Sequence, residues 1–290
     1  MEINGKLLAN KIIDYLKEVV KKENLHPKLV VFSVRPTDDD LIYIGLKKKA
    51  AHTIGADFEV ISYKKTPRFE EFANVLRNKA DSKETTGLII QRPLPSQLAS
   101  ETLFNYVPLL KEIEGHKAKS PFFPPLGLGV FTMLKYVYNP GDKEIIENIL
   151  VNPSADMGFF KQILRRKKIV LMGRGETGGK PIGKMFSEAR INYLNTHSKT
   201  ASDSAFYKEA DIIITAVGKR VLTKDMVKPG VILLNVGYRR DRGVARGDYD
   251  NEDITELASF YTPTPGGIGP LEIAYLMYNL VESVRMQNKA

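Results

Sequence analysis

A glycine-rich segment is the feature that most restricts how this chain of 290 residues can fold. Residues 173–181 read GRGETGGKP and directly follow the apolar run KIVLM of residues 168–172. The spacing matches G-x-G-x-x-G between a strand and a helix, where glycines let backbone N–H groups approach a pyrophosphate. Pro181 suits the first turn of that helix. The segment predicts a dinucleotide-binding turn, although a glycine-rich turn without a ligand has the same pattern.

The end of the next predicted strand indicates which dinucleotide binds. An acidic residue about 20 positions after the glycines would bind a ribose 2′-hydroxyl and indicate NAD. Residues 195–200 read NTHSKT and contain no acid, whereas their hydroxyls, His and Lys, with Arg174 upstream, suit a 2′-phosphate. We therefore expect NADP rather than NAD, although a solvated turn would fit the same residues. The predicted cofactor-binding residues are Gly173, Arg174, Gly175, Thr177, Gly178, Gly179, His197 and Ser198.

Strand and helix patterns alternate along the chain, which is typical of parallel sheets covered by helices on both faces. We expect an α/β fold with two α/β domains, the second beginning somewhere in 123–168. Asp40 is the expected N-cap of the second helix, and residues 139–166 are expected to be a polar connection. The predicted strands are 28–34, 58–63, 87–91, 168–172, 191–195, 212–217, 231–236 and 259–261, and the predicted helices are 7–22, 41–54, 69–79, 128–138 and 271–285.

Composition and charge exclude several classes of protein. Without Cys there is no disulfide scaffold, Cys-ligated zinc or Cys nucleophile. No apolar stretch is long enough to span a membrane and no export signal is visible, so we expect a cytoplasmic protein. Of the net charge of +9, most comes from residues 151–200, which hold ten Lys and Arg but three Asp and Glu. That position favours an anionic cofactor over nucleic acid, which would require a basic groove with aromatic side chains or a known motif.

A tyrosine and a lysine form a second candidate site. Tyr43 and Lys47 are four residues apart and therefore share one face of a helix. A lysine can transfer protons if burial or nearby cations lower its pKa, and Lys48 and Lys49 supply such charge. The same three lysines also fit an ordinary solvated helix face.

Four segments together resemble the bifunctional methylenetetrahydrofolate dehydrogenase/methenyltetrahydrofolate cyclohydrolase family. They are Tyr43-x-x-x-Lys47, QRPLP at 91–95, the glycine turn, and TPTPGGIGP at 262–270, which is close to the family signature TPVPGGVGP. The segments ADIIITAVG at 210–218, KPGVILLNVG at 228–237 and Gly247-Asp248 are also similar. The resemblance covers the whole chain apart from the region near 139–166.

The resemblance implies a domain plan and a reaction. Residues 1–122 and 268–290 would form a folate-binding catalytic domain, to which the C-terminal helix returns, and residues 123–267 a Rossmann NADP-binding domain. The enzyme would oxidise 5,10-methylenetetrahydrofolate with NADP and hydrolyse the 5,10-methenyl product to 10-formyltetrahydrofolate. It would bind tetrahydrofolate derivatives, form a homodimer through its Rossmann domains, and need no metal.

The resemblance also implies roles for individual residues. Tyr43 would stack on the folate ring, Lys47 would serve the cyclohydrolase step, and Gln91 would hydrogen-bond to Lys47 and tune it. Glu114 would anchor the pterin. Each also has a purely structural alternative: a core tyrosine, a polar residue at a strand end, a surface charge. The folate pocket near the nicotinamide would be shaped by Pro265, Gly266 and Gly267, which alternatively form only a rigid turn.

Departures from the family pattern leave other functions open. Glu114 replaces the Asp of the family's DVDG motif, and residues 124–129 read PPLGLG where the family usually has PCTPxG. An enzyme with only the dehydrogenase activity is therefore one alternative. A different Rossmann reductase of a small acidic, shikimate-like substrate is another, and a non-catalytic nucleic-acid-binding protein a third.

Overall fold

The computed structural model describes residues 1–200 and 205–289, which form two compact units. The N-terminal unit contains Ile12–Phe123 and the C-terminal segment from Ile273, and the central unit contains Met1–Lys11 and Pro124–Glu272. The predicted domains divide the chain at 122/123 and 267/268, and these boundaries stay a prediction. Each unit is a parallel sheet with helices, which confirms the expected α/β class.

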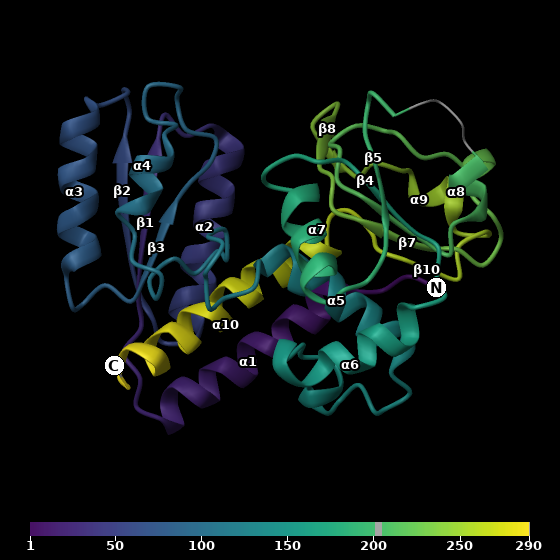
Figure 1. The fold of residues 1–290 in the computed structure, drawn as a ribbon, viewed down its shortest axis with the longest axis horizontal. Helices are drawn as coiled ribbons and strands as arrows, with labels where there is room; N and C mark the ends of the chain where they lie inside the picture. Colours follow the sequence, from purple (N-terminus) through teal and green to yellow (C-terminus); the bar gives the residue numbers. More distant parts are fainter. Residues whose placement is uncertain (201–204, 290) are drawn as a thin grey trace. The chain divides into compact units, whose positions relative to one another are not determined.

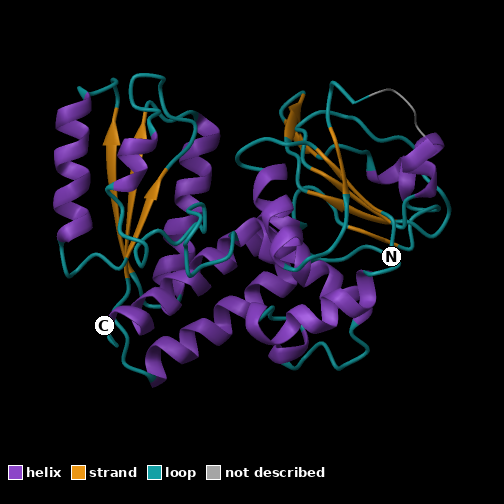
Figure 2. Cartoon of the chain, viewed as in Figure 1, coloured by secondary structure: helices purple, strands orange, loops and turns teal. Residues whose placement is uncertain are grey.

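The N-terminal unit is built on three parallel strands in the order β2-β1-β3. The central strand β1 is buried from Leu29 to Val34, with Lys28 paired to Asp57 on one side and Leu29 to Gly87 on the other. Helices α2 and α3 lie on opposite sides of this sheet (Figure 1), and the strands run side by side between them (Figure 2). The elements are β1 Lys28–Val34, α2 Asp38–Thr53, β2 Asp57–Tyr63, α3 Phe69–Asp81, β3 Gly87–Ile90 and α4 Glu101–Asn105.

Helix α2 begins earlier than the sequence suggested, and the predicted N-cap was wrong. Thr37 is the N-cap: its Oγ1 accepts a hydrogen bond from the backbone N–H of Asp40 at 3.2 Å. Asp40 Oδ2 accepts in return from the Thr37 backbone N–H at 2.8 Å. This reciprocal capping box lets Asp40 serve as the third helical residue instead of the cap.

The central unit has five parallel strands in the order β10-β7-β6-β4-β5. Because the chain passes from β4 to β5 on one side and then to β6 on the other, the strand order reverses at β4. In open α/β sheets ligands bind beyond the carboxyl ends of the strands at such a reversal. The strands are β4 Ile169–Met172, β5 Leu194–Thr196, β6 Ile212–Thr215, β7 Ile232–Asn235 and β10 Phe260–Tyr261, with an antiparallel hairpin of β8 Arg239–Asp241 and β9 Val244–Arg246.

The expectation of a polar connection over 139–166 was wrong for its second half, which forms helix α6 (Pro153–Leu164). Asn152 caps this helix by accepting a hydrogen bond from the Ser154 N–H at 3.1 Å. Its apolar residues Phe160 and Leu164 are buried. The remaining helices of this unit are α5 Pro125–Tyr138, α7 Gly179–Glu188, α8 Ala205–Glu209 and α9 Asn251–Ile254, with 3-10 turns at Ile146–Asn148 and Lys224–Met226.

Two long helices contribute to both units, α1 (Gly5–Lys22) and α10 (Ile268–Gln287). In the second half of α10, Asn279 and Ser283 are buried and hydrogen-bond to backbone carbonyls of the N-terminal unit. The C-terminal helix therefore returns to the N-terminal unit, as predicted. Among the residues described, no helix is both long and apolar enough to cross a bilayer.

Candidate functional site

Lys47 and Gln91 are brought together in the N-terminal unit. Lys47 lies on α2, and Gln91 is the first residue after β3, at the carboxyl edge of the sheet. The Nζ atom of Lys47 donates a hydrogen bond to Oε1 of Gln91 at 2.8 Å, and both side chains are half-buried. Tyr43 lies one turn earlier on α2 and is also half-buried. The arrangement holds a primary amine in a fixed position, as general acid–base chemistry requires.

Glu114 lies in a turn at the same edge of the same sheet. Glu112 pairs with Leu88 of β3 in a parallel bridge, so Glu114 and Gln91 follow neighbouring backbone segments out of the sheet. The Glu112 carboxylate accepts hydrogen bonds from the backbone N–H groups of Glu114 at 3.1 Å and His116 at 3.0 Å. Glu112 was not predicted as a site residue, although it shapes the turn that carries the predicted pterin-binding carboxylate.

The Glu112–His116 turn holds three titratable groups close together. Nδ1 of His116 is 3.7 Å from Glu114 Oε2 and 3.8 Å from Glu112 Oε1. Burial, with a smaller contribution from Glu114, raises the pKa of Glu112, and His116 opposes the shift. Helix α10 steadies the turn, since Asn279 Nδ2 donates to the carbonyl oxygen of Ile113 at 2.8 Å. The turn therefore presents a carboxylate whose backbone is fixed from both sides.

The predicted glycine turn follows β4 in the central unit and folds tightly. Gly173 has φ +109°, and a Cβ atom on it would lie 2.3 Å from the carbonyl oxygen of Ala216. A Cβ on Gly179, the first residue of α7, would lie 2.1 Å from the carbonyl oxygen of Gly173. Only glycine fits at either position. At Gly175 a Cβ would meet no atom within 4 Å, so the turn is open to solvent at this point.

The end of β5 lies against the glycine turn. Asn195 Nδ2 donates to the carbonyl oxygen of Gly173 at 2.8 Å, and the Gly173 N–H donates to the carbonyl oxygen of Thr196 at 2.8 Å. His197 and Ser198 follow directly, and Nδ1 of His197 accepts from the Lys199 N–H at 3.1 Å. These contacts bring His197 and Ser198 beside the turn, as a site for a 2′-phosphate requires. The hydrogen bond from Asn195 to Gly173 was not predicted.

The Thr262–Pro270 segment is anchored by Asn235, the last residue of β7. The Asn235 N–H donates to Thr262 Oγ1 at 2.7 Å, and its side-chain amide donates to Thr264 Oγ1 at 2.5 Å. The following residues Pro265 to Gly267 therefore start from a fixed point at the carboxyl edge of the central sheet. Gly267 is buried, and a Cβ on it would lie 2.5 Å from the carbonyl oxygen of Pro263.

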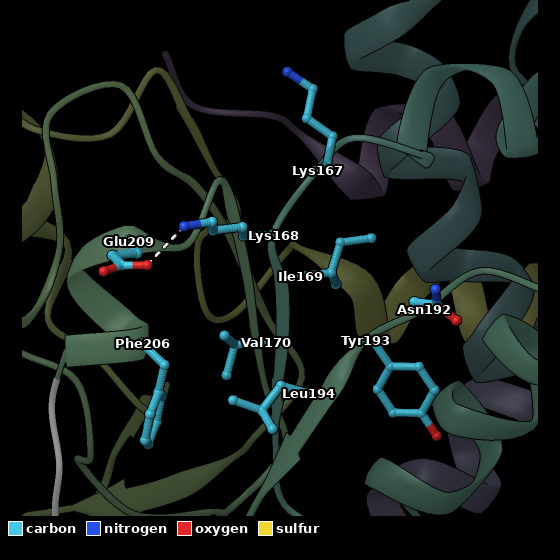
Figure 3. Close-up of a pocket in the computed structure, with 9 residues that line it drawn as sticks. All are labelled: Lys167, Lys168, Ile169, Val170, Asn192, Tyr193, Leu194, Phe206 and Glu209. Atoms are coloured by element: carbon cyan, nitrogen blue, oxygen red, sulfur yellow. Dashed lines mark hydrogen bonds and ion pairs between the residues drawn. The ribbon is translucent and has the colours of Figure 1, made fainter.

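A hollow of about 370 Å³ in the central unit lies away from every predicted site residue. It is at the amino edge of the sheet, where β4 and β5 begin, and Figure 3 shows its lining from these strands and α8. Lys168 turns toward Glu209 there and pairs with it at 2.6 Å. Since dinucleotides bind at the carboxyl edge, this hollow is not the cofactor site.

Two family models match the chain. Residues 3–114 match the model described as tetrahydrofolate dehydrogenase/cyclohydrolase, catalytic domain. Residues 158–288 match the model described as tetrahydrofolate dehydrogenase/cyclohydrolase, NAD(P)-binding domain. The first match covers the part of the chain that carries Lys47, Gln91 and Glu114, and the second covers the part that carries the glycine turn.

Individual relatives match over nearly the whole length. The bifunctional protein FolD of Staphylococcus carnosus is 31% identical over 292 residues, covering 98% of this chain and 97% of the relative. The crystal structure of the bifunctional enzyme FolD from Campylobacter jejuni is similar with a TM-score of 0.84 at 27% identity, over 100% and 99% of the two chains. A 5,10-methylenetetrahydrofolate dehydrogenase from the silkworm Bombyx mori has a TM-score of 0.84 at 25% identity, over 100% and 99%.

Proposed function

The chain belongs to the tetrahydrofolate dehydrogenase/cyclohydrolase family, and on this premise we propose that it catalyses both reactions of the family name. It oxidises 5,10-methylenetetrahydrofolate with NADP, and it hydrolyses the 5,10-methenyl product to 10-formyltetrahydrofolate. The observation that carries the proposal is the hydrogen bond of 2.8 Å between Lys47 and Gln91. This contact positions the Lys47 amine for the hydrolysis, and the same chain has the glycine turn for the dinucleotide.

The oxidation needs little acid–base chemistry from the protein. A hydride leaves the one-carbon bridge, and the two folate nitrogens stabilise the cation that remains. NADP supplies the acceptor for this hydride when it is bound. The protein's task is to orient the folate and exclude water. We assign folate stacking to Tyr43, the pterin contact to Glu114, and the pocket wall near the nicotinamide to Pro265, Gly266 and Gly267.

The hydrolysis needs a base and an acid, and Lys47 can serve as both. Water adds to the methenyl carbon and loses one proton, which leaves a hydroxyl on this carbon. The bond from the carbon to one ring nitrogen then breaks, that nitrogen takes up a proton, and the hydroxyl loses its proton as it becomes the formyl carbonyl. A neutral Lys47 accepts the first proton, and its ammonium form donates the second. Gln91 orients the amine through its Oε1 acceptor. The net reaction consumes one water and releases one proton.

NADP is the cofactor that the residues near the glycine turn support. Glycine is required at Gly173 and Gly179 by the packing of the turn, and Gly175 between them is exposed with open space beside it. Beyond β5 the chain presents His197 and Ser198 where an NAD-binding site would carry an acid. Arg174 is exposed in the turn and supplies positive charge for a 2′-phosphate.

The proposal extends to the partners, the compartment and the domain boundaries of the enzyme. Its partners are tetrahydrofolate derivatives and a second copy of the chain, bound through the NADP-binding domains, and its compartment is the cytoplasm. The folate-binding domain comprises 1–122 and 268–290, and the Rossmann domain 123–267. These assignments rest on membership of the family and on the absence of Cys. Light scattering would test the predicted dimer directly.

A dehydrogenase without cyclohydrolase activity is the second candidate, because the similar silkworm protein is described by the dehydrogenase activity. Two assays decide between the candidates. Methylenetetrahydrofolate is supplied with NADP or NAD in the first, and methenyltetrahydrofolate alone in the second. Activity in both supports the proposal, and activity only in the first supports the alternative. Activity in neither contradicts a folate enzyme.

A further inference from the structure

A buried carboxylate lies beneath the loop that follows β6. Asp248 has no exposed surface. Its two oxygens accept hydrogen bonds from three successive backbone N–H groups, those of Val217 at 2.8 Å, Gly218 at 2.8 Å and Lys219 at 3.0 Å. Successive backbone N–H groups that converge in this way form a nest, which in many proteins binds a free anion. Here the protein's own side chain fills the nest.

The position of Asp248 is fixed on all sides. Its backbone N–H donates to Asn235 Oδ1 at 2.8 Å, and the same oxygen accepts from Thr215 Oγ1 at 2.9 Å. A Cβ atom on Gly237, two residues after β7, would lie 2.1 Å from either carboxylate oxygen. The backbone at Gly237 therefore packs directly against the acid. Burial raises the pKa of Asp248, and the N–H donors oppose this shift. These hydrogen bonds and the close packing of Gly237 hold the carboxylate in place.

The loop held by Asp248 packs against the glycine turn. Ala216 begins this loop, and its N–H donates to the carbonyl oxygen of Met172 at 2.8 Å, directly before the turn. A Cβ on Gly173 would lie 2.3 Å from the Ala216 carbonyl oxygen, and one on Gly178 would lie 3.3 Å from the Ala216 Cβ. A shift of the loop would therefore be transmitted to the turn through atoms already in contact.

We propose that Asp248 is a positioning residue for cofactor binding. It fixes the Ala216–Lys219 loop, and through Ala216 it holds Gly173 and Gly178 in the conformation that accepts the pyrophosphate. It acts through the backbone and touches neither the cofactor nor the folate. The inference rests on the proposed function, in which the glycine turn binds NADP.

The test replaces Asp248 by Asn, which keeps the size but leaves one acceptor oxygen for three N–H donors. We expect the dissociation constant for NADP, measured by isothermal titration calorimetry, to rise about 10-fold or more. The KM for NADP rises in parallel. Hydrolysis of methenyltetrahydrofolate uses no NADP, and it should change by less than about 2-fold. A general loss of folding would lower both activities together.

Asp211→Asn is the matched control. Asp211 precedes the other end of β6, where it accepts from the Lys168 backbone N–H at 2.8 Å and the Lys228 ammonium at 2.7 Å. This variant should lower the melting temperature and leave NADP affinity unchanged. Unaltered NADP affinity in Asp248→Asn, or an equal loss in both variants, would overturn the inference. Absence of both activities from wild-type protein would contradict the proposed function instead, and the comparison of NADP affinities would still decide the role of Asp248.

If Asp248→Asn fails to fold, amide hydrogen exchange of the wild-type protein gives the decision. We expect the backbone amide hydrogens of Val217, Gly218 and Lys219 to exchange slowly, and more slowly still when NADP is added. Exchange as fast as in an unstructured loop would overturn it, and so would protection that NADP leaves unchanged.

Discussion

The Nζ atom of Lys47 donates to Oε1 of Gln91 at 2.8 Å, which links helix α2 to the residue that ends strand β3. A lysine on a helix surface normally samples many rotamers. This contact restricts the amine to one position at the carboxyl edge of the N-terminal sheet. The mechanism of hydrolysis depends on that restriction, because proton transfer requires the donor and acceptor within hydrogen-bond reach.

Gln91→Ala should slow the hydrolysis of methenyltetrahydrofolate by roughly 10- to 100-fold, because a hydrogen bond to a charged group is worth about 1.5–3 kcal/mol. Steady-state rates of the two proteins test this effect. Gln97→Ala removes an exposed amide from the same connection and is the control. An unaltered rate in Gln91→Ala would show that the contact does not serve the reaction.

Arg174→Ser should raise the KM for NADP by about 10-fold and leave the KM for NAD nearly unchanged, because only NADP carries the 2′-phosphate. Steady-state kinetics with both cofactors measure this difference. Arg166→Ser removes an exposed arginine before β4 and should change neither KM. Equal losses with both cofactors would assign Arg174 to the shared pyrophosphate instead.

The Glu112 carboxyl should titrate above its ordinary pKa of 4.5, because burial and Glu114 both favour its neutral form. The folded protein then retains this proton after the unfolded chain has lost it. This group therefore lowers the free energy of unfolding as pH rises from about 4.5 through the folded-state pKa. Carboxyl NMR titration should show the pKa falling in Glu114→Gln and rising in His116→Gln. Shifts in the opposite directions would contradict the assigned causes.

Lys135→Met should lower the free energy of unfolding by roughly 3 kcal/mol, because it leaves the Asp156 carboxylate without its cation in a poorly solvated place. The Lys135 side chain is 7% exposed and lies 2.7 Å from Asp156 Oδ2. Urea denaturation of the single variant and of Lys135→Met/Asp156→Asn measures the effect. The double variant should recover part of the loss, since no unpaired charge remains. Equal stability of the two variants would show that the ion pair does not hold α6 to α5.

Local patterns predicted the strands of the two parallel sheets because buried parallel strands are continuous apolar runs, as in β3 and β6. They did not predict the β8–β9 hairpin. They failed at element ends, where hydrogen bonds between side chain and backbone decide. Thr37 caps α2 because Asp40 reciprocates. Helix α6 had a visible signal in Asn152-Pro153, followed by apolar residues at helical spacing, and the polar surroundings concealed it.

The glycine turn was predicted because its glycines have a regular spacing, between an apolar strand and a proline at a helix start, within one short segment. Asp248, Asn235 and Glu112 were not assigned roles, since each acts on a loop far along the chain or through several backbone groups. No spacing rule indicates that Asp248 reaches Val217 to Lys219. An acid between a glycine and a tyrosine is a weak sequence signal, and only the fold reveals its three N–H donors.

The most direct test of the account follows two products in one reaction of methylenetetrahydrofolate with NADP. In the wild-type enzyme NADPH should accumulate while methenyltetrahydrofolate stays low, because hydrolysis removes it. In Lys47→Met the hydrolysis should be lost while folate binding largely survives, so that both products accumulate in step. Lys83→Met, which changes an exposed lysine before β3, should behave as wild type. Absence of NADPH with the wild-type enzyme, or unchanged hydrolysis in Lys47→Met, would contradict the account.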